Sequence, residues 1–163
     1  MPASLAAMNK TLLTVLAAAS LLSVPALADE RGKVIEAVMD EYLRLWNAHD
    51  AAAVTTQIYR MEGAMGTAAG LQRNFDQLKA QGYDRSTKTS VEGCLLSDTV
   101  GLAELRFTRW KTDGTPLGPK DRVSLYVLRK FPDGWRITEL IGMDVSANLD
   151  CKSAAPPAAA PAR

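Results

Sequence analysis

The 163-residue sequence has few of the side chains that usually build catalytic and metal centres: it contains one histidine and two cysteines. A structural zinc site draws about four ligands, mainly from these residue types, so no metal site and no cofactor are expected. His49 would have to serve any Ser-His-Asp triad, and the sequence has no Gly-x-Ser-x-Gly elbow. The glycines of residues 63–66 lack the Lys-Ser/Thr pair of a phosphate-binding loop. Triad hydrolysis and nucleotide chemistry are therefore not expected.

The sequence also lacks a large excess of charge of either sign, with 19 basic and 18 acidic residues. Such a balance argues against nucleic acid or an anionic membrane surface as the main partner. Residues 106–111 do mix basic and aromatic side chains. On a strand these types alternate between the two faces and form no single basic stripe, so no nucleic-acid partner is predicted.

The first 28 residues are predicted to be a cleavable signal peptide. Lys10 is the only charged residue before Asp29, and residues 12–22 are almost wholly apolar. This run is shorter than the roughly 20 residues that span a bilayer, and Ala26-Leu27-Ala28 fits a small-x-small cleavage site. The residue directly after that site is Asp29 and not a cysteine, so neither a lipid nor a membrane anchor is expected. We predict a periplasmic or secreted protein, cleaved near Ala28.

The last residues, 152–163, are predicted to be a disordered tail because most of them are alanine and proline, which cannot build a core. The folded domain is therefore expected over residues 29–151. Its two cysteines, Cys94 and Cys151, would meet an oxidising environment after export. Such a pair favours a disulfide, and two separate thiols are the alternative.

The first half of the domain is predicted to be helical. Apolar residues at three- and four-residue spacing put one stripe on a helix that ends near Asn47. The stripe consists of Val34, Ile35, Val38, Met39, Tyr42, Leu43 and Trp46. Asp50 suits the N-cap of a short second helix, and a brief strand is expected over Ile58–Met61. Thr67 suits the cap of a third helix, and Gly82 its stop.

The second half is predicted to form four strands, near residues 90–96, 102–110, 122–131 and 135–145, because their apolar residues alternate and turn residues separate them. Helices followed by antiparallel strands indicate an α+β fold, with N-terminal helices packed on an antiparallel sheet, instead of an alternating βα order.

The last two strands are expected to form a hairpin with a three-residue loop, Pro132-Asp133-Gly134. That loop places Phe131 opposite Trp135 and Val127 opposite Glu139, and opposed residues share one face of a sheet. The predicted face is apolar around Glu139. It holds Val123, Leu125, Val127, Trp135, Ile137, Ile141 and Met143.

Leu105 and Phe107 are predicted to continue this apolar face under the helices. Tyr42 and Trp46, on the helical stripe, then either line a cavity above Glu139 or pack in the core. The expected ligand pocket comprises Tyr42, Trp46, Phe107, Val127, Arg129 and Glu139.

Glu139 is the first candidate for chemistry, because a carboxylate among apolar neighbours is poorly solvated and suited to proton transfer. Arg129 lies diagonally from Glu139 on the predicted face, and an ion pair between them would make Glu139 structural instead. Glu62, after the brief strand, is the second candidate acid, with a solvated loop residue as its ordinary role.

The order of elements resembles that of the nuclear transport factor 2-like superfamily, which includes SnoaL-like cyclases and ketosteroid isomerases. The resemblance rests on the helix ending in residues 42–50 (YLRLWNAHD) and on the close of the meander at residues 133–137 (DGWRI), and it covers the whole domain. It implies a curved sheet wrapped around the helices, the cystatin-like cone, with Glu139 lining the enclosed pocket. Related isomerases place an aspartate base after the first strand, where residues 59–66 offer only Glu62. The resemblance also implies a homodimer formed through the outer sheet face.

Three functional hypotheses follow. The first is an exported, non-catalytic module that binds a small apolar ligand or a partner protein. The second is a cofactor-free acid–base enzyme of the isomerase, dehydratase or cyclase type, which uses Glu139 with Glu62 or Tyr42 assisting. The third is a dimeric interaction protein with a filled core. An enzyme requires a cavity that reaches Glu139 and holds no arginine, whereas a filled core leaves no cavity.

Overall fold

A computed structural model describes residues 25–151. The predicted tail, residues 152–163, lies outside this range, as do residues 1–24 of the predicted signal peptide. The helical elements are α1 (Pro25–Asn47), α2 (Ala51–Ala53), η1 (Val54–Ile58), η2 (Ala64–Gly66) and α3 (Ala68–Ala80). The strands are β1 (Tyr83–Leu95), β2 (Val100–Lys111), β3 (Arg122–Phe131) and β4 (Gly134–Met143). Within the described range, no helix is both long and apolar enough to cross a membrane.

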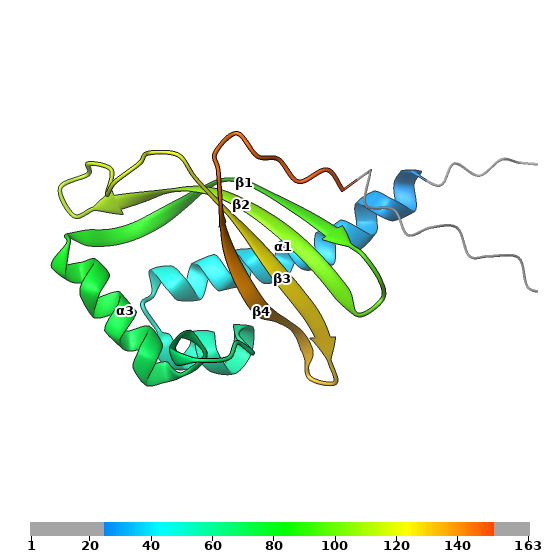
Figure 1. Cartoon of the computed structure of the whole chain (residues 1–163), viewed down its shortest axis with the longest axis horizontal. Helices are drawn as coiled ribbons and strands as arrows, with labels where there is room; N and C mark the ends of the chain where they lie inside the picture. Colours follow the sequence, from blue (N-terminus) through cyan, green and yellow to red (C-terminus); the bar gives the residue numbers. More distant parts are fainter. Residues whose placement is uncertain (1–24, 152–163) are drawn as a thin grey trace, which may run out of the picture.

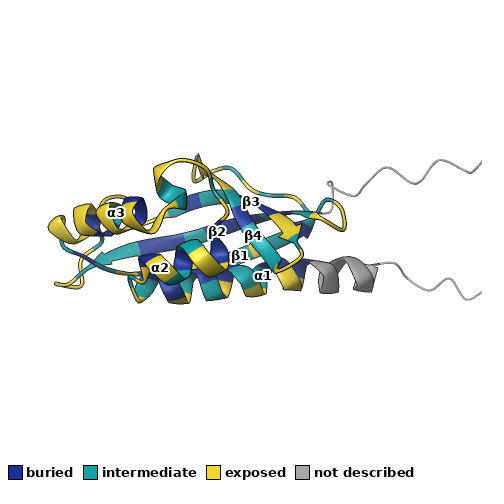
Figure 2. Cartoon of the chain, turned by 90° about the horizontal axis from the view of Figure 1, so that it is seen from below, coloured by how far each residue is buried: buried dark blue, intermediate teal, exposed yellow. Residues whose placement is uncertain are grey.

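The four strands form one antiparallel meander in the order β1-β2-β3-β4. Figure 1 shows this sheet curving over α1, with α3 at one end. The helices cover the concave face, called the inner face below, and Figure 2 shows buried residues on the helix surfaces that turn toward the sheet. The α+β prediction is confirmed.

The stripe of α1 forms the helical half of the core. Ile35, Met39, Tyr42 and Trp46 are all at most 4% exposed, whereas Val34, at the margin of the predicted stripe, is 42% exposed. The spacing of the four buried residues keeps them on one side of the helix, as the sequence predicted. The stripe therefore fixes which side of α1 meets the sheet.

Two glycines let α1 approach β1 closely. A Cβ atom on Gly32 would lie 2.4 Å from the carbonyl oxygen of Gly93, and one on Gly93 would lie 2.6 Å from the carbonyl oxygen of Gly32. Any other residue at either position would push the two backbones apart. This contact places the N-terminal half of α1 against the edge strand.

The predicted helix caps are confirmed. The side chain of Asp50 accepts a hydrogen bond from the Ala53 amide at 2.8 Å, and that of Thr67 accepts one from Gly70 at 3.1 Å. The predicted strand over Ile58–Met61 is wrong: the chain leaves the π-helical η1 and makes a single parallel bridge between Tyr59 and Ile137. β1 also begins seven residues before the predicted start of the first strand.

The predicted hairpin register is wrong near the turn. Phe131 pairs with Gly134 across a two-residue loop, and a bulge follows, so that Leu128 pairs with Ile137 while Val127 still pairs with Glu139. Thr138 is the extra residue of this bulge. It interrupts the alternation along β4, so that Ile137 and Glu139 lie on opposite faces of the sheet and not on the same one. Ile137 is therefore fully buried under the helices, and Glu139 points to the opposite, outer face.

The same bulge splits the apolar face predicted for β3 and β4. The residues of these strands that turn inward include Ser124, Tyr126, Leu128 and Ile137. Val123, Leu125 and Val127, with their partners on β4, lie on the outer face instead. The prediction for β2 is confirmed, because Leu105 is 1% and Phe107 8% exposed.

Residues 144–151, here called the C-terminal strap, return across the outer face of the sheet (Figure 1). Glu104, on β2, binds the Arg106 guanidinium at 2.6 Å and accepts a hydrogen bond from the Leu149 amide at 2.6 Å. Arg106 in turn donates to the carbonyl oxygens of Val145, at 3.0 Å, and Ala147. Glu104 is only 3% exposed, so a buried ion pair within β2 holds the strap on the sheet through hydrogen bonds to the strap backbone.

The strap ends in a disulfide between Cys151 and Cys94 of β1. The two cysteines are 57 residues apart in the sequence. Closing a loop of that length removes enough freedom from the unfolded chain to stabilise the fold by about 4 kcal/mol in the chain-entropy model. The strap is thus held by a covalent bond at its end and by ionic hydrogen bonds along its length.

We expect Glu104→Gln to lower the free energy of unfolding by about 2 kcal/mol, because the amide cannot replace the charge-assisted hydrogen bonds of the buried carboxylate. Urea denaturation with the disulfide intact measures the change. Glu92→Gln is the matched control, since Glu92 lies directly opposite Glu104 on β1 but is exposed. Equal losses in the two variants would mean that Glu104 does not fasten the strap.

Candidate ligand-binding site

A small cavity lies between α1 and the inner face of the sheet. Its volume is about 40 Å³, enough for a few atoms of a ligand or one to two water molecules. Its aromatic walls come from α1 and the central strands: Tyr42, Trp46, Phe107 and Tyr126. Leu43 and Leu140, both partly exposed, lie at its rim.

The polar lining of the cavity is formed by Ser86, Arg109 and Ser124, one residue from each of β1, β2 and β3. Ser86 pairs with Arg109 across the first two strands, which places the hydroxyl beside the base of the arginine side chain. No carboxylate and no histidine is among the described residues that line the cavity. Its chemistry is therefore that of hydrogen-bond donors around one cation.

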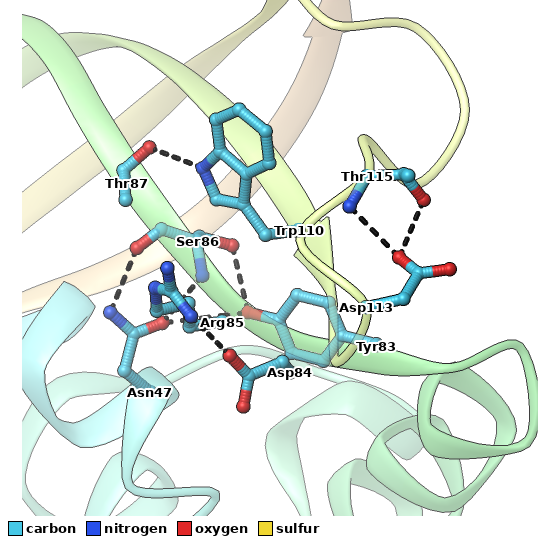
Figure 3. Close-up of polar contacts among 9 residues, drawn as sticks. All are labelled: Asn47, Tyr83, Asp84, Arg85, Ser86, Thr87, Trp110, Asp113 and Thr115. Atoms are coloured by element: carbon cyan, nitrogen blue, oxygen red, sulfur yellow. Dashed lines mark hydrogen bonds and ion pairs between the residues drawn. The ribbon is translucent and has the colours of Figure 1, made fainter.

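A hydrogen-bond network fixes the end of α1 to β1 beside the cavity, and Figure 3 shows its part among Asn47, Tyr83 and Ser86. Trp46 Nε1 donates to the Tyr83 hydroxyl at 3.0 Å, and that hydroxyl lies 2.7 Å from Ser86 Oγ. Asn47 bonds both backbone groups of Ser86, accepting from its amide at 2.8 Å and donating to its carbonyl at 2.9 Å. The positions of Trp46 and Ser86 are therefore set by partners on both elements.

Three tyrosines cluster at one side of the cavity: Tyr42 and Tyr126 line it, and Tyr59 packs against Tyr42. The rings of Tyr59 and Tyr126 lie 5.7 Å and 5.4 Å from the ring of Tyr42, and the Tyr59 hydroxyl donates to that of Tyr42 at 3.3 Å. Burial raises the pKa of all three phenols, and the neighbouring phenols raise those of Tyr42 and Tyr126 further. These hydroxyls stay neutral at ordinary pH and act as hydrogen-bond donors or acceptors.

The predicted pocket residues separate into two groups. Tyr42, Trp46 and Phe107 line the cavity. Val127, Arg129 and Glu139 lie on the outer face of the sheet, where Arg129 and Glu139 are exposed. Among residues 25–151, no ion pair within 4.0 Å joins Arg129 to Glu139. The expectation that Glu139 lines the pocket is therefore wrong, because the bulge at Thr138 turns it away.

The other candidates for chemistry also lie apart from the cavity. Glu62 is exposed in the loop after Tyr59. His49 is half-buried, with its ring edge-on to Phe75 at 5.4 Å and to Tyr83 at 5.5 Å, and burial lowers its pKa. In the part of the chain that the structure describes, no cluster of three His, Cys, Asp or Glu side chains is arranged to hold a metal ion.

The sequence reading missed Arg109, Ser86, Ser124 and Tyr126. Arg109 stands in the basic and aromatic run that was interpreted only as a strand, and alternation from the buried Leu105 and Phe107 would have put it on the same side. The inward orientation of Ser124 and Tyr126 follows only from the pairing of β2 with β3. Ser124 lies opposite the buried Leu105 and therefore shares its face, and alternation along β3 puts Tyr126 on the same face.

A second, wider hollow of about 550 Å³ lies on the surface between α1, η1 and the start of β4. Its walls mix the apolar side chains of Val34, Val38 and Trp135 with the polar ones of Glu41 and Thr56. Val34 and Thr56 are exposed, so this hollow is a surface groove. The cavity against the inner face is the site where buried polar groups converge.

The raised pKa values of the tyrosines predict how the stability of the protein changes in alkaline solution. All four tyrosines of the chain, the three above and Tyr83, have their pKa raised, chiefly by burial. The folded state therefore binds these protons more tightly than the unfolded chain, in which tyrosine has a pKa of about 10. This contribution to stability is complete below about pH 10 and is lost as the pH rises through the folded-state values.

We expect the folded protein to show little tyrosinate absorbance at about pH 11, where the same chain in denaturant is mostly ionised. An ultraviolet titration of both samples measures the difference, and the denatured sample is the control. Titration of two or more tyrosines near the ordinary value in the folded protein would contradict the burial of the cluster.

Solved structures with a similar fold support this architecture. An NTF2-like protein with a cystatin-like fold from Novosphingobium aromaticivorans aligns with a TM-score of 0.54 at 16% identity, over 77% of this chain and 88% of its own. A domain of unknown function with a cystatin-like fold from Nostoc punctiforme aligns with a TM-score of 0.51 at 19% identity, over 66% of this chain and 73% of its own. These likenesses show the fold, and the predicted cystatin-like architecture is confirmed.

No curated protein matches the sequence. The family model described as "NTF2-like protein (DUF6841)" matches residues 29–144, which include every strand and both long helices except the first four residues of α1. The chain therefore belongs to this family of NTF2-like proteins.

Proposed function

We propose that this protein is an exported, non-catalytic binding domain that holds one end of a small molecule in the cavity against the inner face. The observation that carries the proposal is the composition of the cavity: aromatic walls, hydroxyl groups and one arginine converge there without a carboxylate or a histidine in the described lining. Such a site can orient a ligand through donors and apolar contact. It offers no group suited to act as a general base near neutral pH.

The acid–base enzyme loses its proposed base in this arrangement. Glu139 and Glu62 are exposed, and Glu139 lies on the outer face. Tyr42 remains at the cavity, but its raised pKa keeps the phenol protonated. The geometry therefore favours binding over proton transfer.

The size of the cavity restricts the ligand. About 40 Å³ admits a small polar group, whereas sites that enclose a drug-sized ligand have roughly 300–1,000 Å³. We therefore propose a ligand with a compact polar end inside the cavity and an apolar part at the rim, between Leu43 and Leu140. The sequence predicts a small apolar ligand. The proposed ligand is still partly apolar, but it also has a polar group that can bond the polar residues of the cavity lining.

Export is part of the proposal. The apolar N-terminal run and its small-residue cleavage site point to secretion, and the disulfide between Cys94 and Cys151 supports an oxidising compartment. A mature chain beginning at Asp29 would keep both cysteines and the whole of the region matched by the family model.

Native mass spectrometry of the full chain, expressed in a bacterial host and recovered from the periplasm, tests these points together. We expect a polypeptide that begins at Asp29, has two hydrogens fewer than the reduced chain, and carries a small non-protein mass released on denaturation. Ser124→Leu fills the cavity with a larger side chain and should abolish the retained mass.

Ser90→Leu is the matched control, because Ser90 is an exposed residue opposite Arg106 on the outer side of the sheet. It should retain the same mass as the wild-type protein. A wild-type protein with no retained mass would contradict a ligand held through purification, and equal retention by both variants would contradict binding in the cavity. A chain that keeps its first 28 residues would contradict export with cleavage.

We also propose a homodimer through the outer face of the sheet. Leu125 and Ile141 pair there, and Ile141 is 46% exposed, with Val145 of the strap 52% exposed nearby in the chain. Exposed apolar side chains on a sheet face gain free energy when a second copy covers them. These residues lie on the side of the sheet opposite the cavity.

We expect light scattering to give the mass of a dimer for the wild-type protein and of a monomer for Ile141→Glu, because the new carboxylate would be desolvated in the interface. Val34→Glu is the control, since Val34 is similarly exposed, at 42%, but lies on α1. A monomeric wild-type protein, or dissociation of both variants alike, would refute this interface.

A further inference from the structure

Arg109 has an unusual place in the cavity. It is the one charged residue among the described residues that line it, and its Nε is buried without a hydrogen-bond partner. Its guanidinium carbon lies 5.7 Å from the centre of the Phe107 ring, which holds the head group on the inner face. Within residues 25–151, Arg109 makes no ion pair and donates no side-chain hydrogen bond.

A second arginine adds to this positive charge. Arg122 stands opposite Phe107 on β3, and its Nε is also buried without a partner. It donates to the Leu117 carbonyl at 2.9 Å, and burial together with the charge of Arg109 lowers its pKa. Among the described residues, Arg122 likewise has no carboxylate within ion-pair distance.

Each of these two part-exposed arginines has one buried Nε–H donor without an acceptor. Buried N–H donors in folded proteins normally have an acceptor, so an unpaired one beside a cavity points to an acceptor that would enter it. The other groups at the cavity add donors: Ser86 and Ser124 line it, and the Tyr42 and Tyr126 hydroxyls remain protonated. Both the charge and the donors are complementary to an anion.

We infer that the cavity binds the carboxylate group of a small organic acid, with the Arg109 guanidinium as its cationic partner. This rests on the proposed function and names the chemical class of its ligand. A guanidinium binds a planar carboxylate through two parallel N–H donors, and the unpaired Nε is one such donor. The apolar chain of the acid leaves the cavity past Leu43 and Leu140.

The volume favours a carboxylate over a larger oxyanion. The cavity of about 40 Å³ is walled by the rings of Trp46, Phe107 and Tyr126, which restrict it to a compact group. A tetrahedral phosphate is bulkier, carries more charge and is usually bound by several cations or backbone amides. Only Arg109 of the two arginines lines the cavity itself.

The test uses butyrate and its neutral isostere butyramide as probes, with the full mature protein and with chloride keeping the ionic strength constant. We expect the Nε–Hε signal of Arg109 in a ¹⁵N-correlated NMR spectrum to shift and saturate with butyrate and to stay in place with butyramide. Inorganic phosphate is the third probe. Saturation by phosphate at lower concentration than by butyrate would overturn the assignment to a carboxylate.

Arg109→Gln should weaken butyrate binding at least about tenfold, the scale of a lost charge-assisted pair. Arg129→Gln is the control, because Arg129 is exposed on the outer face, and its affinity should equal that of the wild-type protein. Butyrate affinity in these variants is followed by the rise in melting temperature. Should Arg109→Gln fail to fold, the butyrate–butyramide comparison on the wild-type protein still decides.

Equal responses to butyrate, butyramide and chloride would overturn the inference. That result would leave the proposed function intact if native mass spectrometry finds a retained neutral molecule that Ser124→Leu loses. Absence of any retained mass together with saturable, Arg109-dependent butyrate binding would instead mean that the site takes an anion but keeps none through purification. Failure of the carboxylate inference and failure of the proposed function can therefore be told apart by these measurements.

Discussion

The contact between the aromatic stripe of α1 and the concave face of the sheet determines the arrangement of everything else. Tyr42 and Trp46 lie near the centre of that contact, each 4% exposed, with Tyr126 of β3 packed against Tyr42. Burial of such large rings is the main source of stability for a domain of this size. It also brings their polar atoms into the interior, where each needs a partner.

Those partners make the interior of this domain more polar than its apolar stripe suggests. The Trp46 indole, the Tyr83 hydroxyl and Ser86 satisfy one another, and the phenols of Tyr42 and Tyr59 form a second group. Arg109 is left as the unsatisfied member beside the cavity. This unpaired donor, in an otherwise mostly satisfied interior, is the feature on which the proposed ligand site rests.

The outer face of the sheet is organised by a different constraint. The strap crosses it and depends on the buried carboxylate of Glu104, which binds Arg106 and the Leu149 amide. The disulfide between Cys94 and Cys151 then closes the far end. The strap covers Glu104, while Ile141 remains exposed on the same face. One sheet thus separates the candidate ligand cavity on its inner side from a candidate subunit interface on its outer side.

The sequence by itself determined the element types and the helical half of the core. The periodic stripe of α1, the caps at Asp50 and Thr67 and the bounds of β3 all follow from local chemistry that acts within a few residues. The predicted pairing of Val127 with Glu139 is correct only because the wrong loop length and the bulge at Thr138 offset each other. Half of the predicted pocket, Tyr42, Trp46 and Phe107, came from such patterns and does line the cavity.

Only the tertiary structure decided which face of β3 and β4 lies inside. Either alternating set of β3 residues is apolar enough to be buried, so period-two patterning alone does not choose between them. The choice is made by the pairing of Leu105 with Ser124 and by the bulge at Thr138, which allows Ile137 to be buried beside Tyr59. These are contacts between residues far apart in the chain. For that reason the sequence pattern wrongly predicts Glu139 at the site, whereas the place of Arg109 follows from simple alternation along β2 after Leu105 and Phe107.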